Sequence, residues 1–183
     1  MVHGIEPMDS EEAEHRSDVL AWIDAGSPLF RTAKPATPPK HLVSYCVLAD
    51  TDSERIFLVD HRDAERWLPT GGHVEPDEHP ADAAAREMSE ELGIRPDFLA
   101  PVGPYPLLVT VTQTTGRSVP HTDVSLWFAF DLPTVGRIHP DATEFVGSRW
   151  WDLDVVRHGD GTRFDPHLPR FVAKLRAATR KSM

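Results

Sequence analysis

Three glutamates in the middle of the sequence have residue types and a spacing that suit chemistry. Glu87, Glu90 and Glu91 stand at positions i, i+3 and i+4, so in a helix their carboxylates converge on one face. Each like-charge pair at this spacing costs an isolated helix about 0.2–0.5 kcal/mol, and Arg86 is the cation beside them. Hard divalent cations prefer carboxylate oxygens. The spacing therefore indicates a divalent-cation site, and the alternative is a solvated acidic face.

These glutamates need a helix to hold them, and the surrounding residues predict one over Pro80–Leu92. Proline is tolerated in the first turn of a helix, and Gly93 follows as a stop signal. The glutamates lie on a different face from an apolar stripe that packs the helix on a sheet. The stripe residues recur at steps of four, three and four: Ala81, Ala85, Met88 and Leu92.

The residues around the glutamates resemble the Nudix box, G-x5-E-x7-R-E-U-x-E-E-x-G-U, in which U is a bulky aliphatic residue. The pattern fixes nine positions over 23 residues, from 72 to 94, and every one is matched. A match of this length is highly specific, so the chain is similar to MutT-like Nudix hydrolases. The matching residues are Gly72, Glu78, Arg86, Glu87, Met88, Glu90, Glu91, Gly93 and Ile94.

The resemblance implies a fold and an activity. Nudix proteins belong to the α/β (α+β) class, with a mixed β-sheet sandwiched between helices. They use Mg²⁺, for which Mn²⁺ substitutes, to hydrolyse a diphosphate linkage in a nucleoside diphosphate derivative or nucleoside triphosphate. By resemblance, Glu87, Glu90 and Glu91 are catalytic and bind the metal, and the carbonyl of Gly71 or its neighbour adds a ligand. Arg86 braces a catalytic glutamate, and Glu90 is favoured as the base that activates water.

Three further polar residues are candidates for the site. Glu144, six residues before Trp150, resembles an acid found before a late strand of Nudix enzymes, and it is either a metal ligand, the base or a surface residue. His121 and Asp123 begin a strand predicted over Thr122–Phe130, which in this fold lies beside the substrate cleft. They are predicted to contact the substrate. They could instead be metal ligands, but no third partner stands nearby in the sequence, which favours a hydrogen bond at the strand edge.

The segment from Phe164 to Leu175 resembles the end of MutT-type enzymes that cleanse nucleoside triphosphates. Where that branch places an asparagine to bind an oxidised guanine, this chain has Leu168. An apolar contact discriminates weakly between purine substituents. We therefore assign Leu168 to the substrate site and expect little preference for oxidised over normal guanine nucleotides.

The remaining elements are predicted from hydrophobic patterning. Runs rich in β-branched and aromatic residues predict strands, and the first two strands flank a polar turn typical of a hairpin. An apolar face predicts a last helix over Pro169–Ala178. The predicted strands are Leu42–Leu48, Arg55–Val59, Leu107–Thr112, Val124–Phe130 and Phe145–Trp151.

The first 40 residues precede this pattern and are predicted to pack on the core formed by residues 41–183. A capping-box spacing and apolar residues predict a helix over about residues 10–25. Four prolines, Pro28, Pro35, Pro38 and Pro39, deny regular structure to the linker that follows. Leaving the helix's apolar residues wet would expose a patch. Docking on the sheet or across a homodimer is therefore expected for Leu20, Trp22 and Ile23.

Composition limits the classes of partner and location. A formal net charge of −10 opposes binding to nucleic acid, whereas a small nucleotide-like substrate can bind through a bridging cation. No signal-like segment or membrane-length apolar run is present, which predicts a cytoplasmic protein that does not bind membranes. The single cysteine, Cys46, cannot form an internal disulfide and is predicted to be buried. A non-catalytic nucleotide-binding or regulatory module is the alternative function, but all box glutamates are present.

Overall fold

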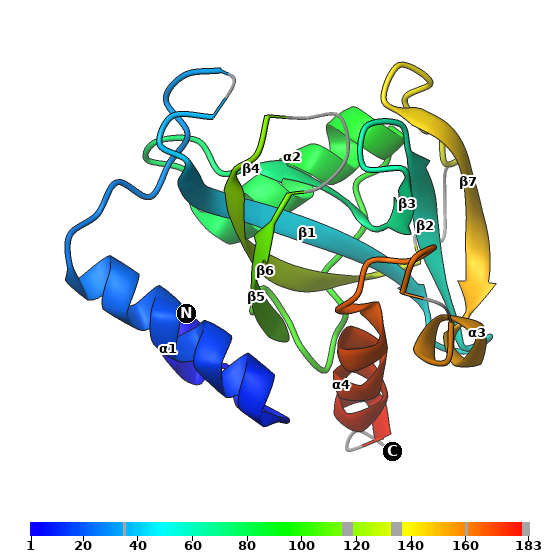
Figure 1. Cartoon of the computed structure of the whole chain (residues 1–183). Coiled ribbons are helices and arrows are strands. Elements are labelled where there is room, and N and C mark those ends of the chain that lie inside the picture. Colours follow the sequence, from blue (N-terminus) through cyan, green and yellow to red (C-terminus); the bar gives the residue numbers. More distant parts are fainter. Residues whose placement is uncertain (35, 115–118, 133–136, 160, 181–183) are drawn as a thin grey trace.

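A seven-stranded mixed sheet forms the centre of the protein, with helices on both faces (Figure 1). The computed structural model describes residues 1–34, 36–114, 119–132, 137–159 and 161–180; Pro35 and the last three residues of the predicted domain lie outside them. The elements are η1 (Val2–Gly4), α1 (Ser10–Asp24), β1 (Lys40–Asp50), β2 (Arg55–His61), β3 (Arg66–Leu68), β4 (Thr70–His73), α2 (Pro80–Leu92), β5 (Leu108–Gln113), β6 (Thr122–Asp131), β7 (Phe145–Asp152), α3 (Leu153–Arg157) and α4 (Leu168–Arg180).

The strands follow the order β3-β2-β1-β6-β5, with β4 paired to β1 and β7 paired to β2. The pairing of β1 with β6 is parallel, and the other pairings of named strands are antiparallel. The predicted hairpin is confirmed as β1 and β2. The short strands β3 and β4 and the short helix α3 have no counterpart among the predicted elements, because three to five residues carry too little periodicity to detect.

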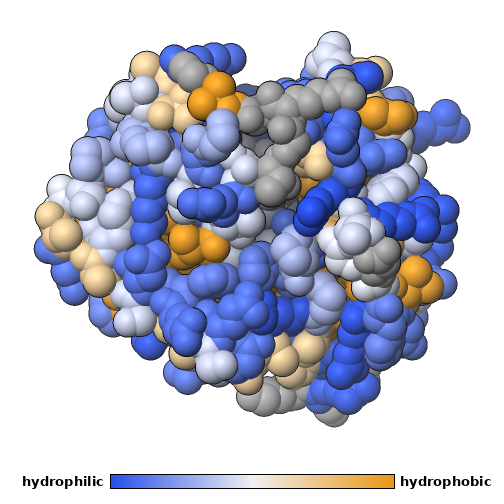
Figure 2. Space-filling view, in the orientation of Figure 1, coloured by the Kyte–Doolittle hydropathy of each residue, from blue (hydrophilic) through white to orange (hydrophobic). Residues whose placement is uncertain are grey.

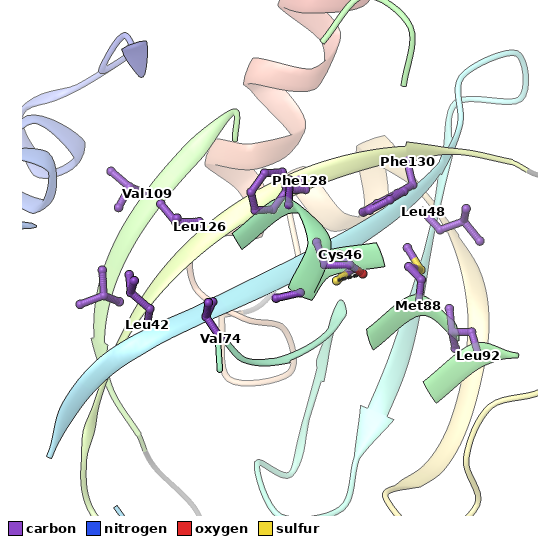
Figure 3. Close-up of a cluster of buried hydrophobic side chains, with 14 of the residues drawn as sticks. Leu42, Cys46, Leu48, Val74, Met88, Leu92, Val109, Leu126, Phe128 and Phe130 are labelled. Carbon is purple, nitrogen blue, oxygen red and sulfur yellow. Dashed lines mark hydrogen bonds between the residues drawn. The ribbon is translucent and has the colours of Figure 1, made fainter. Parts of the chain in front are cut away.

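Successive residues of β1 face opposite sides of the sheet and join two separate cores. Leu42, Cys46 and Leu48 pack in the core beneath α2, whereas Val47 and Ala49 pack beneath α3 and α4. This alternation follows from the period-two geometry of a strand. The sandwich of sheet and helices predicted from the sequence is therefore confirmed. Cys46 lies in the middle of the first core (Figure 3), where it is buried and free, as expected.

Helix α2 begins and ends where the sequence predicts. Pro80 is its first residue, and it ends at Gly93, which adopts a left-handed conformation with φ 66°. Met88 and Leu92 are buried in the first core, as the predicted stripe requires. Ala84, one turn before Met88, is also fully buried, whereas the predicted Ala85 is only partly buried against the same core. The stripe fixes the rotation of the helix, and this rotation turns Glu87 and Glu91 toward β4 and the cavity described below.

Helix α1 is docked against the body of the protein beside β5 (Figure 1). Asp9 caps it by accepting a hydrogen bond from the backbone N–H of Glu12. Val19 is completely buried, and Leu20 and Trp22 pack partly against the same core. Ile23 does not dock on the sheet, because its side chain is 37% exposed; its docking across a homodimer stays a prediction. Ile23 lies one helical turn beyond Val19 on the same side of the helix, but it is in the last turn of α1, which ends at Asp24.

The N-terminal segment is also tied to α4 by charged side chains. Arg170 donates to Asp9 at 2.7 Å and to Glu11 at 2.8 Å. The buried carboxylate of Glu12 accepts a hydrogen bond from Lys174. These contacts attach the N-terminal segment, which precedes the predicted domain in the sequence, to α4, the last helix of that domain.

The outer surface is mainly polar. Figure 2 shows hydrophilic residues over most of one face, with apolar residues in small separate patches. Among the described helices, none combines the length and apolar character needed to cross a membrane.

Candidate active site

A cavity of about 770 Å³ opens beside α2, between the sheet and the loops that flank it. Its walls come from distant parts of the chain, including the N-terminal linker, β1, β4, β6 and the loops before β7 and α4. Carboxylates, histidines and basic groups all face it. The ionisable residues along it include Arg31, Lys34, His61, Arg62, Asp63, Arg66, His73, Glu75, Arg86, Glu87, Glu91, His121, Asp123, Glu144 and Asp165.

Two of the three clustered glutamates line this cavity. Glu87 and Glu91 are buried, and one oxygen of Glu91 accepts the backbone N–H of Gly71 at 2.9 Å. Glu90 lies outside the lining: its side chain is 59% exposed, and it accepts a hydrogen bond from Arg86 at 3.1 Å. The same nitrogen of Arg86 donates to Glu87 at 2.7 Å. The helical spacing therefore brings Glu87 and Glu90 to one nitrogen, while Glu91 faces β4.

The cavity glutamates resist ionisation. Burial raises the pKa of Glu87, and the carboxylates of Glu90 and Glu144 raise it further, against the lowering effect of Arg86. Burial also raises the pKa of Glu91, with added contributions from Glu87 and Glu144. Like charges in a poorly hydrated site disfavour the ionised form. Oxygen donors that crowd together in this way fit a hard divalent cation such as Mg²⁺.

Glu144 reaches this group from the loop before β7. It lines the cavity, and its charge raises the pKa of both Glu87 and Glu91. Its backbone carbonyl accepts the N–H of Arg62 at 3.0 Å, which joins this loop to the end of β2. Of the three roles left open for Glu144, the cavity position suits a ligand or the base. Its side chain is nevertheless exposed, so all three roles stay open.

Arg86 holds the site together through five hydrogen bonds, which use the full donor set of a guanidinium group. Two reach Glu78 at 2.9 and 3.0 Å, one each reaches Glu87 and Glu90, and one reaches the carbonyl of His73 at 3.0 Å. The hydrogen bonds to Glu78 raise the pKa of Arg86 further. Arg86 thereby positions Glu87 and both ends of the loop between β4 and α2.

Two glycines allow β4 to approach the glutamates. A Cβ atom on Gly72 would lie 2.3 Å from a carboxylate oxygen of Glu87. Gly71 has a φ of 154°, which a side chain rarely tolerates, and a Cβ there would lie 2.3 Å from the carbonyl of Ser44. The close approach lets the N–H of Gly71 bind Glu91. The assignment of the Gly71 carbonyl to the metal stays a prediction.

The sheet brings three histidines and an aspartate together beside the cavity, which His73, His121 and Asp123 line. Parallel pairing of β1 with β6 sets His41 opposite Asp123. The Nε2 atoms of His41 and His121 lie 3.4 and 3.2 Å from Oδ1 of Asp123. The ring of His73, from β4, lies 4.8 Å from that of His41 between centroids. The predicted pair His121 and Asp123 thus has two partners that are distant in sequence.

Comparison with models of protein families shows to which family the chain belongs. The family model described as the NUDIX domain matches residues 39–174. The chain belongs to the Nudix family. Its similarity to individual curated Nudix proteins is partial. Over 65 residues it is 34% identical to diphosphoinositol polyphosphate phosphohydrolase 3-beta from cattle, an alignment that covers 36% of this chain and 40% of that protein.

Two other Nudix proteins complete the comparison. A putative 8-oxo-dGTP diphosphatase from Bacillus subtilis is 30% identical over 104 residues, which covers 57% of this chain and 62% of that protein. A NUDIX-family hydrolase of known structure from Clostridium perfringens has a TM-score of 0.57 and 18% identity, covering 75% of this chain and 97% of that one. The structural likeness supports the Nudix fold.

The structure corrects the assignment of Leu168. This side chain is completely buried in the second core and does not line the cavity. It begins α4, whose apolar face packs on the sheet. The cavity residue from this segment is Asp165, and burial raises its pKa to about 6. Asp165 was absent from the predicted site because no spacing in the sequence distinguishes a loop carboxylate in a cavity wall from one in water.

Replacing Asp165 by Asn is expected to stabilise the protein at alkaline pH. Asn keeps an oxygen to accept the N–H of His167, which lies at 2.8 Å. The wild-type pKa rises from 3.8 unfolded to about 6 folded, so wild-type stability is greatest below 3.8 and falls as pH rises through 6. Asn avoids this loss, which is at most about 3 kcal/mol. Urea unfolding should show that Asp165→Asn gains more free energy of unfolding over the wild type at pH 8 than at pH 5. An equal gain at both pH values would show that the raised pKa of Asp165 is not the cause.

Proposed function

We propose that this Nudix protein hydrolyses a diphosphate linkage in a nucleoside diphosphate derivative or nucleoside triphosphate, with Mg²⁺ as cofactor and Mn²⁺ as a substitute. The observation that carries the proposal is the convergence of buried Glu87 and Glu91 with Glu144 on one cavity. Their oxygens are the donors that Mg²⁺ prefers. A bound Mg²⁺ would supply charge neutralisation for the phosphate oxygens and help to orient water.

The residues of the chain divide the remaining work. Arg86 fixes Glu87, and the N–H of Gly71 fixes Glu91, so both carboxylates are held before substrate arrives. Such preorganisation lowers the cost of reaching the transition state. The water needs a proton acceptor, and buried carboxylates with raised pKa values suit that task. Because Glu90 lies outside the cavity lining, we assign the base to one of the cavity glutamates, Glu87, Glu91 or Glu144.

Basic residues on the cavity walls support an anionic substrate. Arg31 and Lys34 come from the linker, Arg62 follows β2, and Arg66 begins β3. Guanidinium and ammonium groups bind phosphate oxygens well. The cavity volume also lies within the range of about 300–1,000 Å³ typical of small-molecule sites. The linker is thus proposed as part of the substrate site, besides packing on the core.

A substrate screen tests the proposal. The full-length protein with Mg²⁺ should be offered nucleoside triphosphates, nucleotide sugars, ADP-ribose, coenzyme derivatives and a diphosphoinositol polyphosphate, with every product identified. We expect cleavage of a phosphoric anhydride in at least one class, abolished by EDTA and restored by Mg²⁺ or Mn²⁺. Oxidised and normal guanine nucleotides should be compared directly. Cleavage confined to phosphomonoesters, or unaffected by EDTA, would contradict the proposal.

The alternative function is a nucleotide-binding or regulatory module without turnover. The complete set of box glutamates argues against it, because a module that only binds has no need of a self-repelling cluster. Saturable nucleotide binding with no product from any compound in the screen would favour the module. The cytoplasmic location, the homodimer and the absence of nucleic-acid and membrane partners stay predictions from the sequence.

A further inference from the structure

We propose that His41, His73, His121 and Asp123 form a second metal site, separate from the glutamates, for a transition-metal ion such as Zn²⁺. One potential ligand atom from each residue lies within 4.8 Å of those of the other three. Three imidazoles and one carboxylate are the ligands that Zn²⁺ takes, whereas Mg²⁺ takes oxygen. The proposal does not depend on the proposed hydrolysis.

The spacing of the ligand atoms fits tetrahedral coordination. A Zn–N distance of about 2.0–2.1 Å places neighbouring ligand atoms about 3.3 Å apart. The distances from Oδ1 of Asp123 to Nε2 of His41 and of His121 are 3.4 and 3.2 Å. The carboxylate and two rings therefore stand almost at the required separation. His73, from the paired strand β4, also has a ligand atom within 4.8 Å of those of the other three residues.

Unpaired polar atoms mark the centre of this group. Nε2 of His41, Nε2 of His73 and Oδ1 of Asp123 are all buried and have no hydrogen-bond partner. The close approach of His41 to Asp123 does not have hydrogen-bond geometry. The His41 side chain is completely buried, yet this nitrogen faces the cluster. Leaving buried polar groups without partners destabilises a protein, and one cation would satisfy all three atoms.

The other ring nitrogens are arranged to support metal binding. Nδ1 of His41 lies 2.8 Å from the carbonyl of Pro38, and Nδ1 of His121 lies 2.6 Å from the carbonyl of Val119. A carbonyl only accepts, so Nδ1 carries the proton in each ring and Nε2 presents its lone pair to the cluster. This backbone support of a ligating histidine is the usual arrangement around bound metals.

The structure contains a second group for comparison, formed by Glu11, His15 and His167. Glu11 is largely exposed and already paired with Arg170, so this group lacks a preformed carboxylate ligand. It provides a matched control, because removing His15 deletes an imidazole without touching the proposed site.

Cobalt(II) titration of the metal-free, full-length protein tests the site. Tetrahedral Co²⁺ bound to nitrogen absorbs visible light strongly, whereas octahedral Co²⁺ bound to oxygen absorbs weakly. With Mg²⁺ in excess, we expect one equivalent of Co²⁺ to give the strong absorption and Zn²⁺ to displace it. His121→Gln and His73→Gln should each weaken Co²⁺ binding by at least about 100-fold. Both positions are partly exposed, and folding of each variant is checked by its thermal unfolding.

Two control variants separate this site from its neighbours. His15→Gln and Glu91→Gln should keep the absorption and stoichiometry of the wild type, because neither residue belongs to the proposed ligand set. Absence of the strong absorption in the wild type would overturn the proposal. Its persistence in folded His121→Gln and His73→Gln, or its loss in His15→Gln, would also overturn it.

Discussion

Replacing Glu91 by Gln is expected to reduce turnover by roughly 10²- to 10⁴-fold, the range typical of losing a group that acts on the reacting atoms. Gln preserves the length and helix propensity of the side chain but removes the charge that would hold a cation. It also keeps an oxygen to accept the N–H of Gly71. Steady-state rates on the substrate found in the screen, measured across Mg²⁺ concentrations, check the result.

The same change should stabilise the metal-free protein. Burial raises the pKa of Glu91 above 4.5, so above pH 4.5 the unfolded chain loses this proton more readily than the folded one. Wild-type stability therefore falls as pH rises from 4.5 through the folded pKa. Gln suffers no such loss. In EDTA, the melting temperature of Glu91→Gln should exceed that of the wild type by more at pH 8 than at pH 5, whereas added Mg²⁺ should stabilise the wild type more.

A variant of the same helix provides the control. Asp82→Asn removes an acidic charge from the first turn of α2, at an exposed position outside the cavity lining. We expect its turnover to stay within about twofold of the wild type, because the side chain does not reach the cavity. Its stability should also change little, since surface substitutions usually change it by no more than about 0.5 kcal/mol. If wild-type turnover survives EDTA, or Glu91→Gln behaves like Asp82→Asn, the cluster is only an acidic face.

Removing residues 1–27 is expected to lower the free energy of unfolding by at least about 3 kcal/mol. The deletion removes Val2, Ile5 and Val19, which are buried in the first core, and burial of each aliphatic side chain contributes about 1.5–3 kcal/mol before entropy is subtracted. It also leaves Lys174 without its buried partner Glu12. Urea unfolding and size-exclusion chromatography of the truncated protein measure the loss and any change in oligomeric state.

Two point variants test whether the truncation acts through the loss of buried side chains or only through the shortening of the chain. Val19→Ala should destabilise the full chain, whereas Ile23→Ala, at an exposed position of the same helix, should change stability by no more than about 0.5 kcal/mol. If the truncated protein melts at the wild-type temperature and keeps its size and activity, the docked segment has no stabilising role.

Patterns of neighbouring residues in the sequence predicted those parts of the fold that depend on interactions between residues close together in the chain. The stripe that ends at Leu92 defined α2, because a helix repeats its contacts every three or four residues. The turn between β1 and β2 was equally visible. The sequence did not show that Val19, rather than Ile23, docks on the sheet, because both lie on the same side of the helix and tertiary packing decides between them. Leu168 was misplaced because resemblance in a short segment gives an alignment without showing which side chain faces the cavity.

The candidate site was predictable only where its residues share one helix. The box spacing located Glu87 and Glu91, but it could not show that Glu90 points outward, since that depends on the rotation of α2 against the sheet. His41 joins Asp123 only through the parallel pairing of β1 with β6. Parallel pairing leaves no turn in the sequence by which to recognise it.

Because residues alternate along β1, the register of this strand determines the apolar core and the cavity wall together. Leu42 and Cys46 face one core, while His41, Val43 and Tyr45 face the side that carries the cavity. A shift by a single residue would exchange these two sets. Such a shift would place the imidazole of His41 in the apolar core, and it would remove Val43 and Tyr45 from the cavity wall. Register errors are therefore removed by instability, so the folded fraction of a preparation and its active fraction should coincide.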